Sequence, residues 1–376
     1  MLVEAYHNMQ KEIYNGPSLN KYFQTKTLQR LKGIGLFCGM DYVGIKSMQP
    51  REFYSRYEHS VNIAHTAGPL SGENLTEILA GLFHDVGSLS FAHVNSFKKG
   101  EGLTQENDEL NVKSVILKDE ELLTYLHEDG INLDDVCDAS KYPLLDKEIP
   151  ALCLDRADGI LATCLFWAST HSIEEIHELY YMLSYLEKLH YGGYDMHCDR
   201  LVNEKSEIIF NGELIIDENF PNVADYEDFF KAINVYSSIL LTKENRYLME
   251  VFGLVLKFYE DMNIITEADL FNFSEQEIID RIFDSRYAQV WKDFVHITEV
   301  DYARSDDNLI IYSKPKIRQA NPLVWGHMEV TEINMISGDF YRELNPLEEA
   351  ISLVDKPLVS NLSKETSMIL KKYKKR

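Results

Sequence analysis

The chain has 376 residues, of which 45% are hydrophobic and 26% are charged, which is the composition of a folded globular protein. Its formal charge of −24 disfavours a nucleic-acid polymer or an anionic membrane as partner, because either requires a net positive face. The five cysteines include no CxxC pair, and the N-terminus lacks the apolar core of a signal peptide, so we expect a cytoplasmic protein.

Hydrophobic residues at helical spacing predict a mainly α-helical fold. The N-terminal segment, residues 1–50, begins with a helix and contains a glycine-rich loop at 31–40. Further helices are expected over residues 52–68, 74–87, 109–129, 132–138, 151–169 and 173–190, and two more within 223–263. Short strands are expected over 308–313 and 327–334, where apolar residues alternate with polar ones.

These elements suggest three regions along the chain. Residues 1–50 are expected to pack on a helical core formed by residues 51–200. Residues 201–376 are expected to add further helices and a small strand-containing part near 305–335. Within the core, Gly87 stands where a C-terminal helix cap is expected.

A possible metal site is the most specific feature of the sequence. His84 and Asp85 are adjacent on a predicted helix, where they project about 100° apart and can both lean toward one point. His59 and Asp155, from two other predicted helices, would complete a set of two imidazoles and two carboxylates. Such a set suits a divalent ion such as Fe, Mn, Zn or Mg. Taken singly, His59 could instead be a core histidine and Asp155 a salt-bridge partner.

Four motifs around these residues follow the order and rough spacing of the HD-domain phosphohydrolases: Arg56-Tyr-Glu-His59, Leu82-Phe-His84-Asp85-Val-Gly87, Phe91-Ala-His93 and Leu154-Asp155-Arg-Ala-Asp158. Within that superfamily the chain most resembles the deoxynucleotide triphosphohydrolase-like branch, the SAM- and HD-domain dNTPases. Two flanking stretches, 28–32 and 314–323, support this resemblance.

The resemblance implies an HD-domain helical core with additional C-terminal helices. It implies that a divalent metal ion is held by four residues, which are His59, His84, Asp85 and Asp155. It also implies that Asp85 orients the attacking water. Because relatives often form homo-oligomers, a homo-oligomer is expected here as well.

Two more residues are candidates for catalysis beside Asp85. His93 follows Asp85 after a turn, where it could meet a phosphate or give a proton to the leaving oxygen; otherwise it is a surface loop histidine. Arg56 lies one turn before His59 on the same helix face. Its guanidinium could hold a phosphate in a fork, or it could form a structural ion pair.

The chain also departs from the triphosphohydrolase pattern. Ser88 stands where those enzymes have a histidine, and a second expected histidine is missing near residues 107–109. Leu36 falls at a position next to the sugar that is usually polar, and a leucine cannot hydrogen-bond a hydroxyl group. Asp108 or Glu109 could replace the missing histidine as general acid if burial raised its pKa.

The sequence therefore predicts a metal-dependent phosphohydrolase in which a metal-activated water attacks phosphorus. The expected substrate is a nucleotide or a related small phosphoester. One alternative is different chemistry on the same residues, such as phosphodiester hydrolysis or oxygenation. An oxygenase needs a second metal site, and His93 and His127 are the only further histidines between His84 and Asp155 that could act as its ligands. The other alternative is a catalytically altered protein that acts as a nucleotide-binding sensor or interaction module.

Overall fold

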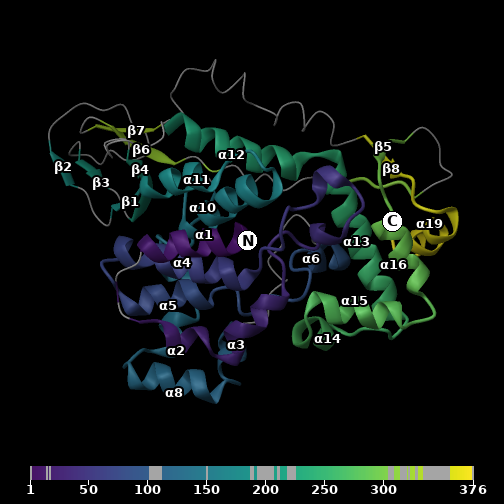
Figure 1. The fold of residues 1–376 in the computed structure, drawn as a ribbon, viewed down its shortest axis with the longest axis horizontal. Helices are drawn as coiled ribbons and strands as arrows, with labels where there is room; N and C mark the ends of the chain where they lie inside the picture. The colour runs from purple at the N-terminus through teal and green to yellow at the C-terminus, as the bar shows by residue number, and fades with distance from the viewer. Residues whose placement is uncertain are drawn as a thin grey trace.

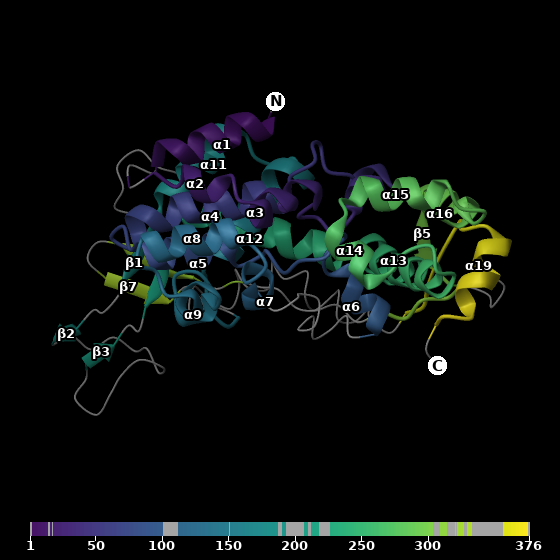
Figure 2. The same ribbon diagram turned by 90° about the horizontal axis from the view of Figure 1, so that it is seen from below.

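The computed structural model describes residues 2–13, 16, 18–100, 112–149, 151–186, 190–192, 207–209, 212–217, 226–303, 309–313, 320, 322–326, 329–332 and 356–374. Helices dominate these residues, which confirms the predicted mainly α-helical fold. Figures 1 and 2 show an elongated molecule with two groups of helices and a small sheet at one end. The long helix α12 (Tyr226–Leu241) runs from the first group toward the second (Figure 1).

The first group of helices surrounds α4 (Arg56–Leu70), which is buried along most of its length. Ser55 and Glu58 form a capping box that sets the start of α4 and hence the position of His59 one turn later. Against α4 pack α1 (Leu2–Ile13), α5 (Leu75–Phe83) and α10 (Leu154–Ala162). The remaining elements of this part are α2 (Asn20–Phe23), α3 (Lys26–Gln29), η1 (Arg30–Gly33), η2 (Met40–Tyr42), η3 (Lys46–Met48), α7 (Val112–Ile116), α8 (Glu120–Glu128), α9 (Leu133–Val136), η4 (Ala139–Lys141), η5 (Thr163–Trp167) and α11 (Ile173–Tyr181).

The second group of helices surrounds α13 (Lys243–Asp261). Its other elements are α6 (Val94–Lys99), α14 (Glu267–Asn272), α15 (Glu275–Phe283), α16 (Ala288–Val295), α19 (Lys364–Lys371) and the strand pair β5 (Val300–Tyr302) and β8 (Leu358–Ser360). Helix α6 follows the His84-Asp85 pair in sequence but packs along α13, and buried Lys98 forms an ion pair with Glu260 there. Contacts thus cross the predicted boundary near residue 200, and that boundary stays a prediction.

Gly253 allows α13 and α6 to approach closely. A Cβ atom at this position would lie 2.7 Å from the backbone nitrogen of Lys98 and 2.8 Å from the carbonyl carbon of Phe97. Because backbone cannot move aside as a flexible side chain can, we expect Gly253→Ala to lower the free energy of unfolding by about 1–3 kcal/mol in urea titrations. Gly159→Ala is the matched control, since nothing lies within 4 Å of a Cβ there. Equal effects of the two substitutions would contradict this packing.

The strands among the described residues differ in part from the prediction. The largest sheet has the order β1-β4-β6-β7, and β4 and β6 are parallel while the other pairs are antiparallel. Its strands are β1 (Leu183–Leu186), β4 (Glu213–Asp217), β6 (Leu323–Gly326) and β7 (Glu329–Glu332), and a separate pair is formed by β2 (His190–Gly192) and β3 (Glu207–Ile209).

The expected strand region near 305–335 is confirmed by β6 and β7. The expected helix over 173–190 is wrong beyond Tyr181, because β1 pairs with β4 from Leu183 onward. Of the predicted strand 308–313, Ile311 makes only an isolated bridge to Leu358.

The helix predicted over 74–87 ends at Phe83, so His84 and Asp85 lie in the turn that follows α5. The guanidinium of Arg30 donates to the carbonyl oxygens of Val86 and Ser88, both at 2.8 Å, and these bonds hold the turn in place. The prediction that Gly87 caps the helix is therefore wrong, and this glycine does not take up a left-handed conformation.

Other boundaries follow from local capping. The helix predicted over 109–129 is divided at Asp119, whose side chain accepts from the backbone nitrogen of Leu122 and starts α8. The helix predicted over 151–169 is α10 continued by the π-helix η5, and the two helices expected within 223–263 are α12 and α13. In the part of the chain that the structure describes, no helix has both the length and the apolar character needed to cross a bilayer.

Candidate metal centre

Ligand atoms of three side chains, from α4, the turn after α5 and α10, lie close together, and Asp85 lies beside the two histidines. The ligand atoms of His59, His84 and Asp155 all lie within 4.8 Å of one another. Asp155 Oδ1 is 3.0 Å from His59 Nε2 and 3.7 Å from His84 Nε2. Asp85 Oδ2 closes the set at 3.9 Å and 3.7 Å from the same two nitrogens. Ligands of one Zn-sized ion at about 2.1 Å are roughly 3.0–3.4 Å apart, so a small contraction would fit this set to an ion.

Two ligand atoms of these residues that form no hydrogen bond within the described part of the chain are also suited to bind a metal ion. Asp85 Oδ2 and His84 Nε2 are buried and have no hydrogen-bond partner among the described residues. Each imidazole is instead held through its other nitrogen: His84 Nδ1 lies 2.7 Å from the carbonyl oxygen of Gly81 and His59 Nδ1 lies 2.6 Å from Asp158 Oδ2. A proton on Nδ1 in both rings leaves Nε2 free to bind a cation, as in most histidine-ligated metal sites.

The electrostatics of the four residues are those of a site that attracts positive charge. Burial disfavours the protonated form of His59, but hydrogen bonds and charges from Asp155 and Asp158 outweigh it and raise the pKa of His59 to about 10. Burial likewise opposes protonation of His84, and Asp85 and Asp155 raise its pKa to about 8. For Asp155 burial is outweighed by the two histidines, which hold the pKa of this carboxyl well below its usual range. A divalent ion would take the place of these protons, so metal binding is expected to release protons.

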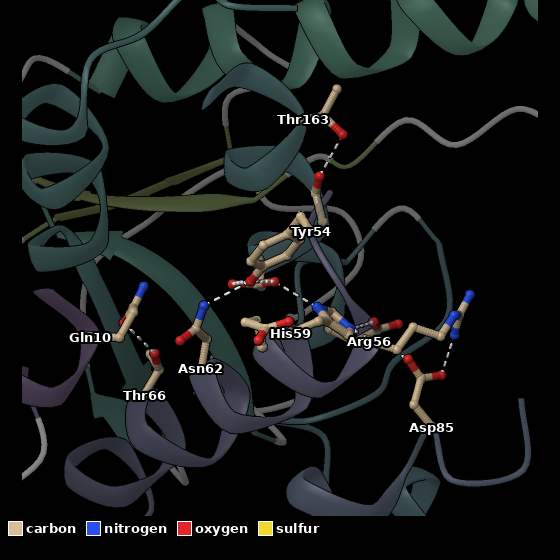
Figure 3. Close-up of polar contacts among 12 residues, drawn as sticks. Gln10, Tyr54, Arg56, His59, Asn62, Thr66, Asp85 and Thr163 are labelled. Carbon is tan, nitrogen blue, oxygen red and sulfur yellow. Dashed lines mark hydrogen bonds and ion pairs between the residues drawn. The ribbon is translucent and has the colours of Figure 1, made fainter. Parts of the chain in front are cut away.

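Asp158 hydrogen-bonds to His59 on the side of the ring away from the candidate metal site. Its carboxylate receives hydrogen bonds from three buried tyrosines, Tyr6 at 3.0 Å, Tyr180 at 2.6 Å and Tyr54 at 3.1 Å. Asn62 in turn donates to the phenol oxygen of Tyr54 at 2.7 Å (Figure 3). The motif containing Asp158 is evident in the sequence, but its role is not. One signal for that role was its position three residues after Asp155, on the same face of a helix.

Arg56 is engaged in an ion pair. Its Nη1 atom donates to Asp85 Oδ1 and, at 3.0 Å, to Ser88 Oγ (Figure 3). This interaction keeps Oδ1 of Asp85 occupied and leaves Oδ2 directed at the two histidines. Ser88, which replaces the histidine of the resembled enzymes, is buried and serves as a hydrogen-bond partner of this pair. Of the two alternatives for Arg56, the structure shows the ion pair, and a contact with phosphate stays a prediction.

His93 reaches the same cavity from the start of α6. The two residues before it, Phe91 and Ala92, have left-handed backbone conformations, with φ of 64° and 43°. Such conformations persist only where other contacts hold them. Here buried Glu275 of α15 accepts from the backbone nitrogens of Phe91 at 3.0 Å and Gly35 at 3.1 Å. Glu275 therefore ties the turn that carries His93 to the second group of helices.

The protonation of Glu275 predicts a pH-dependent stability. Burial, and next the charge of Asp41, raise the pKa of Glu275 from 4.5 to about 8. The folded chain thus binds this proton more tightly than the unfolded chain, and the stabilisation is complete below about pH 4.5 and is lost as the pH rises through about 8. Relative to wild type, the free energy of unfolding of Glu275→Gln is expected to rise over this interval, as measured by urea titration at several pH values. The exposed Glu299→Gln control should run parallel to wild type, and a parallel course for Glu275→Gln would contradict the assignment.

A cavity of about 590 Å³ is lined by the four candidate ligand residues. Its size is that of a site for a nucleotide-sized molecule. Asp155 is half exposed on its floor, whereas His59 and Asp85 are buried. Leu36 lines the cavity, so an apolar side chain does face the space in which a substrate would lie. Asp108, Glu109 and most of the stretch 314–323 lie outside the described residues.

Comparison with known proteins identifies a similar sequence and similar solved structures. No model of a known protein family matches this chain. It is similar to an uncharacterized protein, YdhJ, from Bacillus subtilis strain 168, with 24% identity over 314 residues that cover 82% of this chain and 84% of the relative. Among solved structures it is similar to a phosphohydrolase from Bacteroides thetaiotaomicron, with 11% identity and a TM-score of 0.49 over 93% of this chain and 97% of the other. Likeness of this strength does not carry an activity from one chain to another, so the residues of the cavity themselves must indicate the function.

Proposed function

We propose that this chain is a metal-dependent phosphohydrolase of the HD-domain type that acts on a small phosphoester. The observation that supports this most strongly is the grouping of His59, His84 and Asp155, with Asp85 beside the two histidines, in the lining of a nucleotide-sized cavity. A divalent ion bound there would neutralise charge on a phosphoryl oxygen and lower the pKa of a neighbouring water molecule, which makes it a nucleophile near neutral pH.

The side chains of the cavity provide the other functions that hydrolysis requires. Asp85 would orient the attacking water through Oδ2, because Arg56 and Ser88 fix its Oδ1 atom. Arg56 would act on Asp85 as a positioning residue and would add positive charge near the phosphoryl group. His93, on the cavity wall, would give a proton to the leaving oxygen. Nucleotides are the first substrates to test, given the resemblance to the dNTP triphosphohydrolase-like branch.

A second candidate function is a nucleotide-binding sensor. It is favoured by Ser88, which has no acidic proton to give and is already bonded within the Arg56–Asp85 pair. In a sensor the metal and the nucleotide would bind, but no phosphoester bond would be cleaved.

A substrate screen separates the two functions. The protein would be loaded in turn with Fe²⁺, Mn²⁺, Zn²⁺ and Mg²⁺ and offered nucleoside monophosphates, nucleoside and deoxynucleoside triphosphates and p-nitrophenyl phosphate. We expect metal-dependent release of phosphate, pyrophosphate or triphosphate from at least one of these compounds. Binding of metal and nucleotide without any turnover would favour the sensor and overturn the proposed hydrolase.

A further inference from the structure

Arg246 is a buried cation on the cavity wall that the proposed hydrolysis does not use. It belongs to α13, in the second group of helices, whereas the residues of the metal centre come from the first group (Figure 1). Its side chain is 4% exposed. A guanidinium buried this deeply normally has a carboxylate or several carbonyl oxygens around it, because an uncompensated buried charge is costly.

Arg246 differs in this respect from the other arginines of the cavity. Arg56 is paired with Asp85. Arg156 donates through both of its Nη atoms to the carbonyl oxygens of Ala151 and Lys147. Arg246 makes one long hydrogen bond, at 3.3 Å, to the carbonyl oxygen of Ser313, and its Nε atom is buried without a partner. Among the described residues, no carboxylate lies within ion-pair distance of Arg246.

The direction of the pKa shift of Arg246 is consistent with its small number of hydrogen-bond partners. Burial is the largest influence on Arg246 and lowers its pKa, and the smaller opposing effects of Tyr302 and Glu244 do not restore it. The planar guanidinium group offers two parallel N–H donors, which match the oxygen atoms of a phosphate or a carboxylate. An anionic ligand group would therefore supply the counter-charge that the described side chains do not.

The wall of the cavity also includes apolar side chains. Leu36 and Ile63 belong to the first group of helices, and Leu240 and Met249 belong to α12 and α13. A ligand that filled the cavity would therefore contact apolar side chains as well as the metal centre and Arg246. The lining thus combines a metal-binding end, apolar surface and a cationic residue.

Building on the proposed function, we infer that Arg246 binds a second oxyanion group of the substrate, a phosphate or a carboxylate, at a distance from the phosphoryl group that is cleaved. The substrate then carries a second anionic group in addition to the phosphoryl group that is cleaved. Its two ends contact the two groups of helices, so substrate binding joins them across the cavity.

The test uses alkylphosphonates, which bind metal centres and are not hydrolysed. The Mn²⁺-loaded full-length protein would be titrated calorimetrically with three series of compounds with alkyl chains of about four to about eight carbon atoms, a length suited to a cavity of this size. One series ends in a methyl group, one in a carboxylate and one in a second phosphonate. The carboxylate and phosphonate series show which oxyanion Arg246 prefers.

We expect at least one dianionic compound to bind wild type about 10-fold or more tightly than the methyl-terminated compound of equal length. This preference should fall to less than about 2-fold in Arg246→Met and should be intermediate in Arg246→Lys, which keeps the charge and loses the fork. Arg286→Met, an exposed arginine of the second group, should keep the full preference.

Two results would overturn the inference. The inference fails if wild type binds dianionic and methyl-terminated compounds equally well at every chain length, and this result does not depend on whether Arg246→Met folds. Retention of the preference in a folded Arg246→Met would overturn the inference directly. If no phosphonate bound in a metal-dependent manner, the proposed function itself would fail together with the inference. Metal-dependent binding of the methyl-terminated series without the preference would leave the proposed function standing and remove only the role of Arg246.

Discussion

Replacement of His84 by alanine is expected to abolish metal-dependent phosphohydrolase activity, with turnover reduced by about 10³-fold or more. His84 Nε2 is one of four atoms that would hold the ion, and it has no other hydrogen-bond partner in the described structure. Loss of this ligand leaves three, one of which is the half-exposed Asp155. Metal content after dialysis and initial rates on the substrate found in the screen are the two measurements.

The matched control is His127→Ala. His127 is exposed on α8, so its removal should change neither metal content nor rate. Because the His84 side chain is only 15% exposed, the unfolding temperature of His84→Ala is measured as well, and metal content is compared at a temperature where both proteins are folded. Full metal occupancy and wild-type turnover in His84→Ala would contradict the assignment of this ligand.

The second large effect is expected for Asp158→Asn, which should weaken divalent-metal binding by about 10- to 100-fold. The carboxylate of Asp158 orients His59 through Nδ1 at 2.6 Å and makes Nε2 a stronger ligand. An asparagine offers one acceptor oxygen where the carboxylate offers two, so some of the tyrosine donors lose their partner. We also expect a loss of about 3 kcal/mol in the free energy of unfolding, since the network is buried.

Tyr180→Phe is the control that separates orientation of His59 from general loss of packing. It removes one donor to Asp158 and keeps the carboxylate that holds His59. The metal dissociation constant of Tyr180→Phe should rise less than 10-fold, even though the variant is destabilised. Equal losses of metal affinity in the two variants would show that Asp158 acts through stability alone.

Local patterns in the sequence predicted much of the helical framework and picked out the residues that lie around the candidate metal site. Helical spacing of apolar residues locates α4 and α5 to within about four residues, and it predicts two helices in the range that holds α12 and α13, because burial of one face is a local property of the chain. The sequence singles out the adjacent His84 and Asp85 and the motifs around His59 and Asp155. The structure places these residues close to one another.

Features that depend on distant parts of the chain were not predicted. The turn that carries His84 and Asp85 is held by Arg30, more than fifty residues earlier. Strand β1 follows a predicted helix without a break in pattern, and its pairing with β4 decides its conformation. Arg246 belongs to no motif, and only the folded chain places it on the cavity wall.

The same reason explains why the role of Asp158 was missed. Its partners Tyr6 and Tyr180 lie far from it in opposite directions along the chain. In the local sequence, only its spacing from Asp155 sets Asp158 apart from an ordinary helical aspartate that forms a surface salt bridge. Its function becomes visible only when α1, α4, α10 and α11 are packed together.

The central claim is that one divalent ion is held by His59, His84, Asp85 and Asp155 at the floor of the cavity. Anomalous X-ray scattering, recorded at the absorption edge of Mn or Zn from crystals of the metal-loaded protein, tests it most directly. We predict a single strong peak about 2.0–2.3 Å from Nε2 of both histidines and from a carboxylate oxygen of each aspartate. A metal-loaded crystal with no peak between these four residues, or with its peak at other side chains, would contradict the claim.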